Sequence, residues 1–248
     1  MNNTNIVKYQ DDIYAFENLL SAEECKSVVD LINAQSEYGL HEWVPISFYE
    51  SFTIGYPPVN HELFNKFNLP GDFFPQLQKK IEELTASVAG SESGKMSNIG
   101  LHVQRWDVGS YAHYHSDNSD NDGNLGAFER SRYAAFLYLN EDFEGGTLEF
   151  KDPNLIITPK AGTLMAFHGG HKNIHRVNMV TGGHRYTIGS FWDDKEYEDY
   201  PEAKRKMWED QLRKDRESQQ VLIKDWSKAK EEGFKILPNG EKYKFVED

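Results

Sequence analysis

The sequence predicts a mainly β fold with flanking helices, in which a small sandwich or barrel of the jelly-roll kind forms the centre. Short β-rich runs alternate with turn signals such as Gly145-Gly146 and Gly182-Gly183, and this alternation is typical of sandwiches and barrels. Helical patterns lie before and after these runs. The expected strands are near residues 98–106, 110–115, 132–139, 146–150, 154–158, 163–168, 174–180 and 185–192.

The length of 248 residues fits one large domain, or one domain with an appendage, and 38% hydrophobic residues suffice for a sizeable core. We expect residues 1–95 to form helices and strands that pack on the core. Residues 96–194 are expected to form the jelly-roll core itself. Residues 195–248 are expected to form a charged, mostly helical C-terminal appendage.

Helix signals appear twice before the β-rich region. Ser21 and Glu24 have the spacing of a capping box, and the apolar face that follows predicts a helix to about Ala34. A second helix is expected over residues 74–89, where apolar residues recur at helical spacing. Residues 43–54, between these helices, have the composition of strands.

Charged residues dominate the C-terminal region. We expect one or two solvated helices over residues 201–231 and a turn at residues 237–240, which read LPNG. The apolar residues expected to anchor these helices are Trp208, Leu212, Val221, Ile223 and Trp226.

The charge and the single cysteine exclude several classes of function. A formal net charge of -13 disfavours non-specific binding to nucleic acid. With Cys25 alone, neither an intramolecular disulfide nor a cysteine-rich metal site is expected. The N-terminus has no secretory pattern, and no apolar run approaches the length of a membrane span. We therefore expect a cytoplasmic protein that does not bind membranes.

One long polar segment interrupts the β-rich region. Residues 117–130 read DNSDNDGNLGAFER and predict a long surface loop. Long loops in compact domains are often functional, so this loop is a candidate lid, and the alternative is an ordinary mobile loop.

Three residues suggest a metal site. His115 and Asp117 are two positions apart, so on a strand they share one face. With His175 meeting them across the sandwich, they would form the two-histidine, one-carboxylate triad of non-haem Fe(II) oxygenases. A polar pair at a strand edge is more often simply solvated. The residues alone also leave other histidines open as ligands, namely His113, His168, His171 and His184.

Arg185 is the candidate partner for an anion. It begins the last expected strand, ten residues after His175. A dicarboxylate that chelates the metal at one end would need a buried cation for its far carboxylate, and a guanidinium offers a bidentate match. A lone arginine is otherwise more often a surface charge.

Five segments share an order with a known family. They read WDVGSYAHYHSD (106–117), RYAAFLYLN (132–140), EGGTLEF (144–150), GTLMAF (162–167) and HRVNMVTGGHR (175–185). Together they resemble the signature of prolyl 4-hydroxylase-like 2-oxoglutarate oxygenases. The resemblance covers about residues 12–194, and five segments in one order are far more specific than any one of them.

The resemblance assigns roles to particular residues. It makes His115, Asp117 and His175 the iron ligands, and Arg185 the partner of the distal carboxylate of 2-oxoglutarate. It adds Tyr138 as a hydrogen-bond donor to the same carboxylate. It implies a double-stranded β-helix, with residues 96–194 as the catalytic core and helices packed on one side.

The sequence departs from the family at one position, where Trp106 replaces the leading tyrosine. An indole can only donate, through its N–H, so a co-substrate contact made by that tyrosine would be altered or absent.

The implied function is hydroxylation of a C–H bond with Fe(II), 2-oxoglutarate and O2, with ascorbate as a candidate reductant. The favoured substrate is a prolyl residue in a peptide or protein. The alternatives are a free amino acid or other small molecule, or a non-catalytic jelly-roll binding module. A metal-dependent cupin-type enzyme without 2-oxoglutarate is disfavoured by Arg185 and Tyr138. Related nucleic-acid demethylases carry a second arginine where this chain has Phe191, so a nucleic-acid substrate is not expected.

Overall fold

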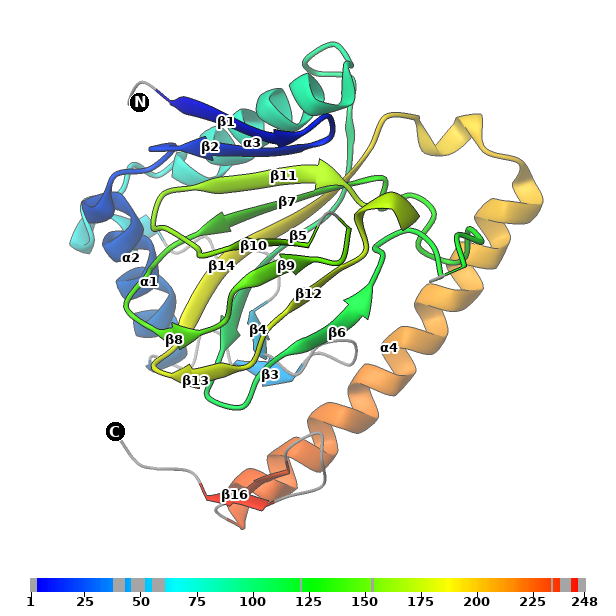
Figure 1. Ribbon diagram of the computed structural model, residues 1–248. Helices are drawn as coiled ribbons and strands as arrows, with labels where there is room; N and C mark the ends of the chain where they lie inside the picture. The colour runs from blue at the N-terminus through cyan, green and yellow to red at the C-terminus, as the bar shows by residue number, and fades with distance from the viewer. Residues whose placement is uncertain are drawn as a thin grey trace.

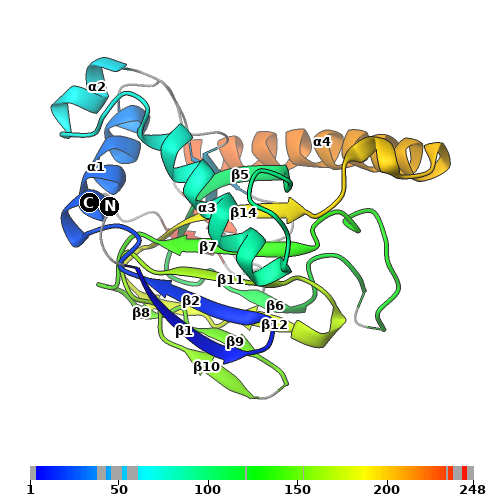
Figure 2. The ribbon, with the colours of Figure 1, turned by 90° about the horizontal axis from the view of Figure 1, so that it is seen from above.

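Two facing β-sheets form the centre of the computed structural model, and helices pack on the outer side of one of them (Figure 1, Figure 2). The structure describes residues 4–37, 43–45, 52–54, 61–120, 122–152, 154–232, 234–236 and 242–244.

In the described residues, the larger sheet has the strand order β1-β2-β11-β7-β14-β5-β4-β3, and all neighbours are antiparallel. The registers place Trp106, Tyr138 and Arg185 on the inner face, toward the second sheet. The strands are β1 (Asn5–Gln10), β2 (Ile13–Glu17), β3 (Val44–Pro45), β4 (Phe52–Ile54), β5 (Ser97–Trp106), β7 (Tyr133–Tyr138), β11 (Leu164–His168) and β14 (Arg185–Asp193).

The smaller sheet has the order β10-β9-β12-β6. Its middle strand β12 pairs antiparallel with β9 on one side and β6 on the other, so His175 lies opposite both Phe150 and His115. The strands are β6 (Ala112–His115), β9 (Leu148–Phe150), β10 (Leu155–Ile157) and β12 (His175–Val177). Two separate pairs are β8 (Glu144–Gly145) with β13 (Val180–Gly182), and β15 (Phe234–Ile236) with β16 (Lys242–Lys244).

The predicted mainly β jelly roll is confirmed, and each of the eight expected runs contains a strand. The run near residues 174–180 divides into β12 and the start of β13. The sequence does not predict β1 and β2. Most of β1 is exposed, so it lacks the apolar pattern of a half-buried strand, and only its pairing with β2 makes it extended.

Helices α1 (Ala22–Glu37) and α3 (Phe73–Ala89) confirm the two N-terminal helix predictions, while the short α2 (His61–Lys66) was not predicted. The capping box forms as expected. The backbone N–H of Ser21 donates to the Glu24 carboxylate at 2.8 Å, and the backbone N–H of Glu24 donates to the Ser21 hydroxyl at 3.1 Å. Of the expected strand region at residues 43–54, the described part contains β3 and β4.

Burial on both faces of the larger sheet explains its apolar strands. On the outer face, Leu31 of α1 and Ile81 of α3 belong to one buried cluster with Leu137 and Ile188 of the sheet. Figure 2 shows these helices on one side of the larger sheet and the smaller sheet on the other. The cluster between the sheets contains Ile13, Ala15, Ala134, Tyr138, Leu148, Phe150, Ile157, Met165 and Phe167.

The C-terminal region contains a single long helix, α4 (Glu202–Glu231), preceded by a short 3-10 helix at Tyr197–Asp199. Trp208 is buried as expected. Leu212 and Val221 were wrongly expected to be anchors, because their side chains are exposed on α4. The side chains of Ile223 and Trp226, and the expected turn at residues 237–240, lie outside the described residues. In the described part of the chain, no helix is both long and apolar enough to cross a membrane.

The start of α4 contacts the end of the predicted surface loop, whose described residues contain no strand. The Arg130 guanidinium donates to the fully buried carboxylate of Asp193 at 2.9 Å and lies 5.9 Å from the ring of Trp208. Lys204 donates to both carboxylate oxygens of Glu129 at 2.7 and 2.8 Å. The loop is therefore anchored at its C-terminal end by the appendage.

Gly162 joins the N-terminal segment to the sheet at a close backbone approach. Its carbonyl accepts from the N–H of Leu19 and its N–H donates to the carbonyl of Tyr138, both at 2.8 Å. Its φ is +75°, and a Cβ at this position would lie 2.1 Å from the carbonyl oxygen of Leu20. Only glycine satisfies both constraints.

Replacing Gly162 with alanine is expected to lower the free energy of unfolding by roughly 3 kcal/mol, because the left-handed backbone and the clash both carry a cost. Gly94 is the matched control, since its φ is +80° but nothing lies within 4 Å of an added Cβ. Gly94→Ala should lose only about 1–2 kcal/mol. Urea unfolding measures both variants, and equal losses would contradict the steric part of this explanation.

Candidate active site

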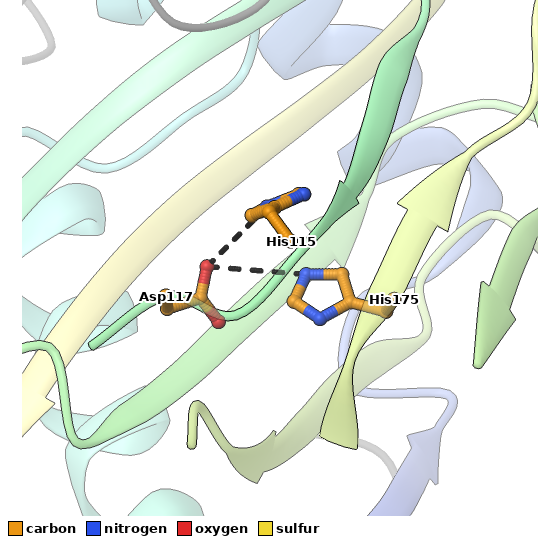
Figure 3. Close-up of side chains that lie close together, drawn as sticks. All are labelled: His115, Asp117 and His175. Carbon is orange, nitrogen blue, oxygen red and sulfur yellow. Dashed lines mark ion pairs between the residues drawn. The ribbon is translucent and has the colours of Figure 1, made fainter. Parts of the chain in front are cut away.

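His115, Asp117 and His175 are brought together by the pairing of β6 with β12. His115 ends β6, His175 begins β12, and the two residues are register partners. Asp117 follows two residues after His115, and its backbone N–H donates to the carbonyl of Gly169 at 2.7 Å. Figure 3 shows the three side chains directed toward one another.

The three side chains have the spacing of a metal site. One potential ligand atom from each lies within 4.8 Å of the other two. Oδ1 of Asp117 is 3.7 Å from Nε2 of His115 and 3.9 Å from Nε2 of His175. Two imidazoles and one carboxylate converging from one side leave further coordination positions open for other ligands.

Backbone carbonyls orient both imidazoles. Nδ1 of His115 donates to the carbonyl of His113 at 2.7 Å, and Nδ1 of His175 donates to the carbonyl of Asn173 at 2.9 Å. A carbonyl can only accept, so the ring proton resides on Nδ1 and the lone pair on Nε2. Each Nε2 is therefore ready to bind a metal, and this arrangement is common around metal-binding histidines.

The environment of Asp117 fits a bound cation. Its side chain is 0% exposed, and neither carboxylate oxygen accepts a hydrogen bond. Burial raises the pKa of Asp117 to about 7, while the nearby His115 opposes this shift. Burial also lowers the pKa of His175 to about 4, so this imidazole is neutral at pH 7. A buried carboxylate without a donor is costly, and a divalent metal held with two neutral imidazoles removes that cost.

Among the described residues, no other histidine joins this cluster. His113 is exposed and packs against Tyr111 at 4.9 Å between ring centroids. His168 accepts from the N–H of Gly170, and its ring packs against Tyr133. The remaining two candidates, His171 and His184, are exposed.

A polar network on the outer face of the smaller sheet ties together the strands that carry the ligands. Glu149 of β9 accepts hydrogen bonds from Tyr114 of β6 and, at 2.8 Å, from Arg176 of β12. The Arg176 guanidinium also lies 4.6 Å from the Tyr114 ring. Hydrogen bonds from Tyr114, Asn178 and Arg176 lower the pKa of Glu149 to about 2. This network supports the register that pairs His115 with His175.

Arg185 lies at the other end of the same interior and has no anionic partner among the residues that the structure describes. It is 2% exposed, and its Nε has no hydrogen-bond partner. Its guanidinium lies 5.1 Å from the ring of Trp106 and 4.9 Å from the ring of Tyr138, and Nη2 donates to the Tyr138 hydroxyl at 3.4 Å. Burial lowers the pKa of Arg185, but a guanidinium stays charged. The pocket therefore suits a carboxylate.

Trp106 forms one wall of this pocket. Its ring contacts the Arg185 guanidinium, and its indole N–H donates to Oε1 of Gln104 at 3.3 Å. The hydroxyl of Thr187 donates to the same oxygen at 3.3 Å. Sequence reasoning missed Gln104, although strand alternation places it on the same face as Trp106.

One small cavity connects the two ends of this interior. Its lining includes both histidines of the candidate metal site together with Arg185 and Tyr138. The lining residues are Gln104, Trp106, His115, Phe136, Tyr138, Leu148, His175, Val177 and Arg185.

Comparisons with known proteins match the part of the chain that contains this site. Residues 101–193 match the model of the 2OG-Fe(II) oxygenase superfamily. Prolyl 3-hydroxylase 3 of Homo sapiens is 36% identical over 101 residues, which cover 36% of this chain and 14% of that protein. The 2-oxoglutarate and iron-dependent oxygenase domain-containing protein 3 of Rattus norvegicus is 37% identical over 83 residues, which cover 32% of this chain and 24% of that protein. The chain thus spans only a minor part of these relatives.

Solved structures share the fold. The viral collagen prolyl hydroxylase of Paramecium Bursaria Chlorella virus-1 superposes with a TM-score of 0.53 at 22% identity, covering 73% of this chain and 94% of that one. A Pseudomonas putida prolyl-4-hydroxylase superposes with a TM-score of 0.53 at 18% identity, covering 75% of this chain and 94% of that one.

The raised pKa of Asp117 predicts a pH-dependent stability of the metal-free protein. Because the pKa is higher in the folded state, ionising Asp117 destabilises the fold as pH rises from about 4 to about 7. Asp117→Asn should therefore raise the stability of metal-free protein at pH 8 by roughly 2–4 kcal/mol, and change little at pH 4. Unfolding in the presence of a chelator measures this difference. Asp122→Asn, an exposed residue of the same loop, is the control. An equal gain in the free energy of unfolding at pH 4 and at pH 8 would contradict the raised pKa of Asp117.

The family match lies over the strands that hold the three clustered side chains, and the related structures share the jelly roll. Relatives and structural neighbours alike are prolyl hydroxylases or 2-oxoglutarate oxygenases by name. Residues 101–193 therefore match the 2OG-Fe(II) oxygenase superfamily, and the fold around them is similar to that of solved prolyl hydroxylases.

Proposed function

We propose that this chain hydroxylates a C–H bond of a prolyl residue in a peptide or protein, with Fe(II), 2-oxoglutarate and O2. In this reaction one oxygen atom of O2 enters the new hydroxyl group. The other enters succinate, which forms from 2-oxoglutarate with release of CO2. The oxygenase chemistry follows from the family and the site, and the prolyl substrate is the finer part of the proposal.

The observation that carries the proposal is a pair of buried, uncompensated charges at one cavity: Arg185 lines it, and Asp117 lies beside the two histidines that line it. Asp117 has no hydrogen-bond donor and Arg185 has no carboxylate within ion-pair distance among the described residues. A cation near Asp117 and a dianion reaching Arg185 would satisfy both. Fe(II) with 2-oxoglutarate supplies this combination. A non-catalytic binding module would have no need of it.

One set of side chains would bind the iron, and another would bind and orient the co-substrate. Nε2 of His115, Nε2 of His175 and the Asp117 carboxylate would hold the iron. When bound, the iron supplies activation of dioxygen coupled to decarboxylation of 2-oxoglutarate. Arg185 and Tyr138 would bind the far carboxylate by hydrogen bonds to a buried anion. The apolar lining around them limits access of water to the site.

The names of the relatives support the prolyl substrate. Several are prolyl 3-hydroxylases, and one structural neighbour is a prolyl hydroxylase solved with a hypoxia inducible factor peptide fragment. A free amino acid or another small molecule is the competing substrate class. Ascorbate as reductant and a cytoplasmic location stay predictions from the sequence.

Anaerobic titration of the Fe(II)-loaded protein with 2-oxoglutarate tests the proposal. Chelation of iron by the 2-oxo acid gives a weak visible charge-transfer band, which we expect in the wild type and not in His175→Ala. Far-UV circular dichroism confirms that the variant is folded. A folded, iron-loaded wild type without the band would overturn the co-substrate assignment.

Removing the Arg185 charge should abolish selectivity for a dicarboxylate. In the wild type, 2-oxoglutarate should bind about 100-fold more tightly than 2-oxobutyrate, which lacks the far carboxylate. In Arg185→Leu both acids should bind with similar, weak affinity, measured by the same band. The control is Arg213→Leu, on the exposed part of α4. Unchanged selectivity in Arg185→Leu would contradict the role of this arginine.

A further inference from the structure

The inner face of the larger sheet continues beyond the residues assigned above. Along β5 and β14 the register pairs are Trp106 with Arg185, Gln104 with Thr187, His102 with Gly189, and Gly100 with Phe191. At about 3.3 Å per residue, the stretch from Arg185 to Phe191 spans roughly 20 Å. A five-carbon dicarboxylate held at Arg185 fills only the first part of this face. The part around His102 is left for another molecule.

Three aromatic side chains on this further part are half-buried, and in β7 and β14 the other residues are all buried. They are His102 of β5, Phe136 of β7 and Phe191 of β14. The Phe191 ring lies 6.1 Å from His102 and 5.8 Å from Phe136, centroid to centroid. These side chains keep part of their surface exposed although they face the second sheet.

The same rings lead directly to the candidate metal site. Phe136 lines the cavity together with both histidines of that site. It also packs against Phe167, 6.2 Å away, and Phe167 packs against His175, 4.9 Å away, centroid to centroid. A molecule resting on Phe136 and Phe191 would therefore lie next to the metal ligands.

The orientation of His102 follows from its neighbours. The indole of Trp106 can only donate, so the atom of Gln104 that faces it must be the amide oxygen, and Thr187 donates to the same atom. The other end of the amide, Nε2, therefore donates to Nε2 of His102 at 3.1 Å. A neutral imidazole that accepts at Nε2 carries its proton on Nδ1. His102 thus offers one N–H donor of defined position.

The surroundings of this donor are uncharged. Burial lowers the pKa of His102 to about 4, so the ring is neutral at pH 7. The inner-face positions of β5, β7 and β14 around it are Gln104, Thr187, Gly189, Phe136 and Phe191, none of which carries a charge. A Cβ on Gly189 would lie 3.0 Å from Phe136 and 3.3 Å from His102, so a larger residue would crowd both rings.

We propose that His102, Phe136 and Phe191 form the site for the hydroxylated substrate, and that Nδ1–H of His102 donates to a neutral carbonyl oxygen of a peptide. The apolar rings suit the ring of a prolyl residue. A free amino acid carries an ammonium and a carboxylate, for which these positions offer no charged partner. The inference rests on the proposed function and selects a peptide-embedded prolyl residue over free proline. His102 is thereby a specificity-determining residue.

The test compares wild type, His102→Leu, His102→Asn and the exposed control His171→Leu. The probes are a pool of acetylated, amidated pentapeptides with a central proline and randomised flanks, and free L-proline. Mass spectrometry detects the gain of one oxygen atom, and kinetics on the most reactive peptide separate KM from kcat. The 2-oxoglutarate chelate band of each variant shows that the fold and the co-substrate site are intact.

The wild type should hydroxylate peptides of the pool but not free L-proline. His102→Leu should raise KM for the peptide about ten-fold with less effect on kcat, and with an unchanged chelate band. The control should match the wild type. His102→Asn should recover part of the loss, because its amide N–H lies near the position of Nδ1. Absence of the band in wild type would refute the proposed function itself. A normal band with an unchanged KM in His102→Leu would overturn this inference alone. A normal band with no turnover of the pool, or with preference for free proline, would overturn this inference together with the prolyl-peptide part of the proposed function.

Discussion

The antiparallel pairing of β6 with β12 is the constraint on which the site depends. It places His115 opposite His175, and the backbone carbonyls of the same strands fix the tautomer of both rings. Glu149 reinforces this pairing from the outer face, where it joins Tyr114 and Arg176. A slip of one residue would turn one histidine away from the interior, since alternate residues of a strand face opposite sides. The register of a short strand pair thus sets the metal geometry.

The interior of the jelly roll holds two opposite charges that the protein itself leaves uncompensated. Such an arrangement costs stability unless a cation and an anion enter together. The proposed metal and co-substrate sites are therefore adjacent: both histidines of the candidate metal site and Arg185 line one cavity, and its apolar lining would strengthen the attraction for charged ligands. The unpaired charges lower the stability of the ligand-free protein and raise its affinity for the two ligands.

The indole of Trp106 affects the orientation of side chains several residues away. Because the indole of Trp106 only donates, it orients Gln104, and Gln104 in turn orients His102. The two ends of the inner face, one for a charged co-substrate and one uncharged, are therefore connected by a short hydrogen-bonded row along β5. Outside this interior, helix α4 contacts the end of the polar loop, where Lys204 donates to Glu129 and Trp208 lies beside Arg130.

Local patterns in the sequence determined the eight strand runs between residues 98 and 192, the capped helix after Ser21 and the residue types of the candidate metal site. These depend on alternation, caps and turn residues, which act over a few positions. Only the tertiary structure decided the rest. The edge strand β1 is extended only because it pairs with β2. Leu212 was expected to anchor the C-terminal helix, but its side chain is exposed. The positions of Gln104 and His102 depend on neighbours from distant strands, because register and burial are set by long-range packing rather than by spacing along the chain.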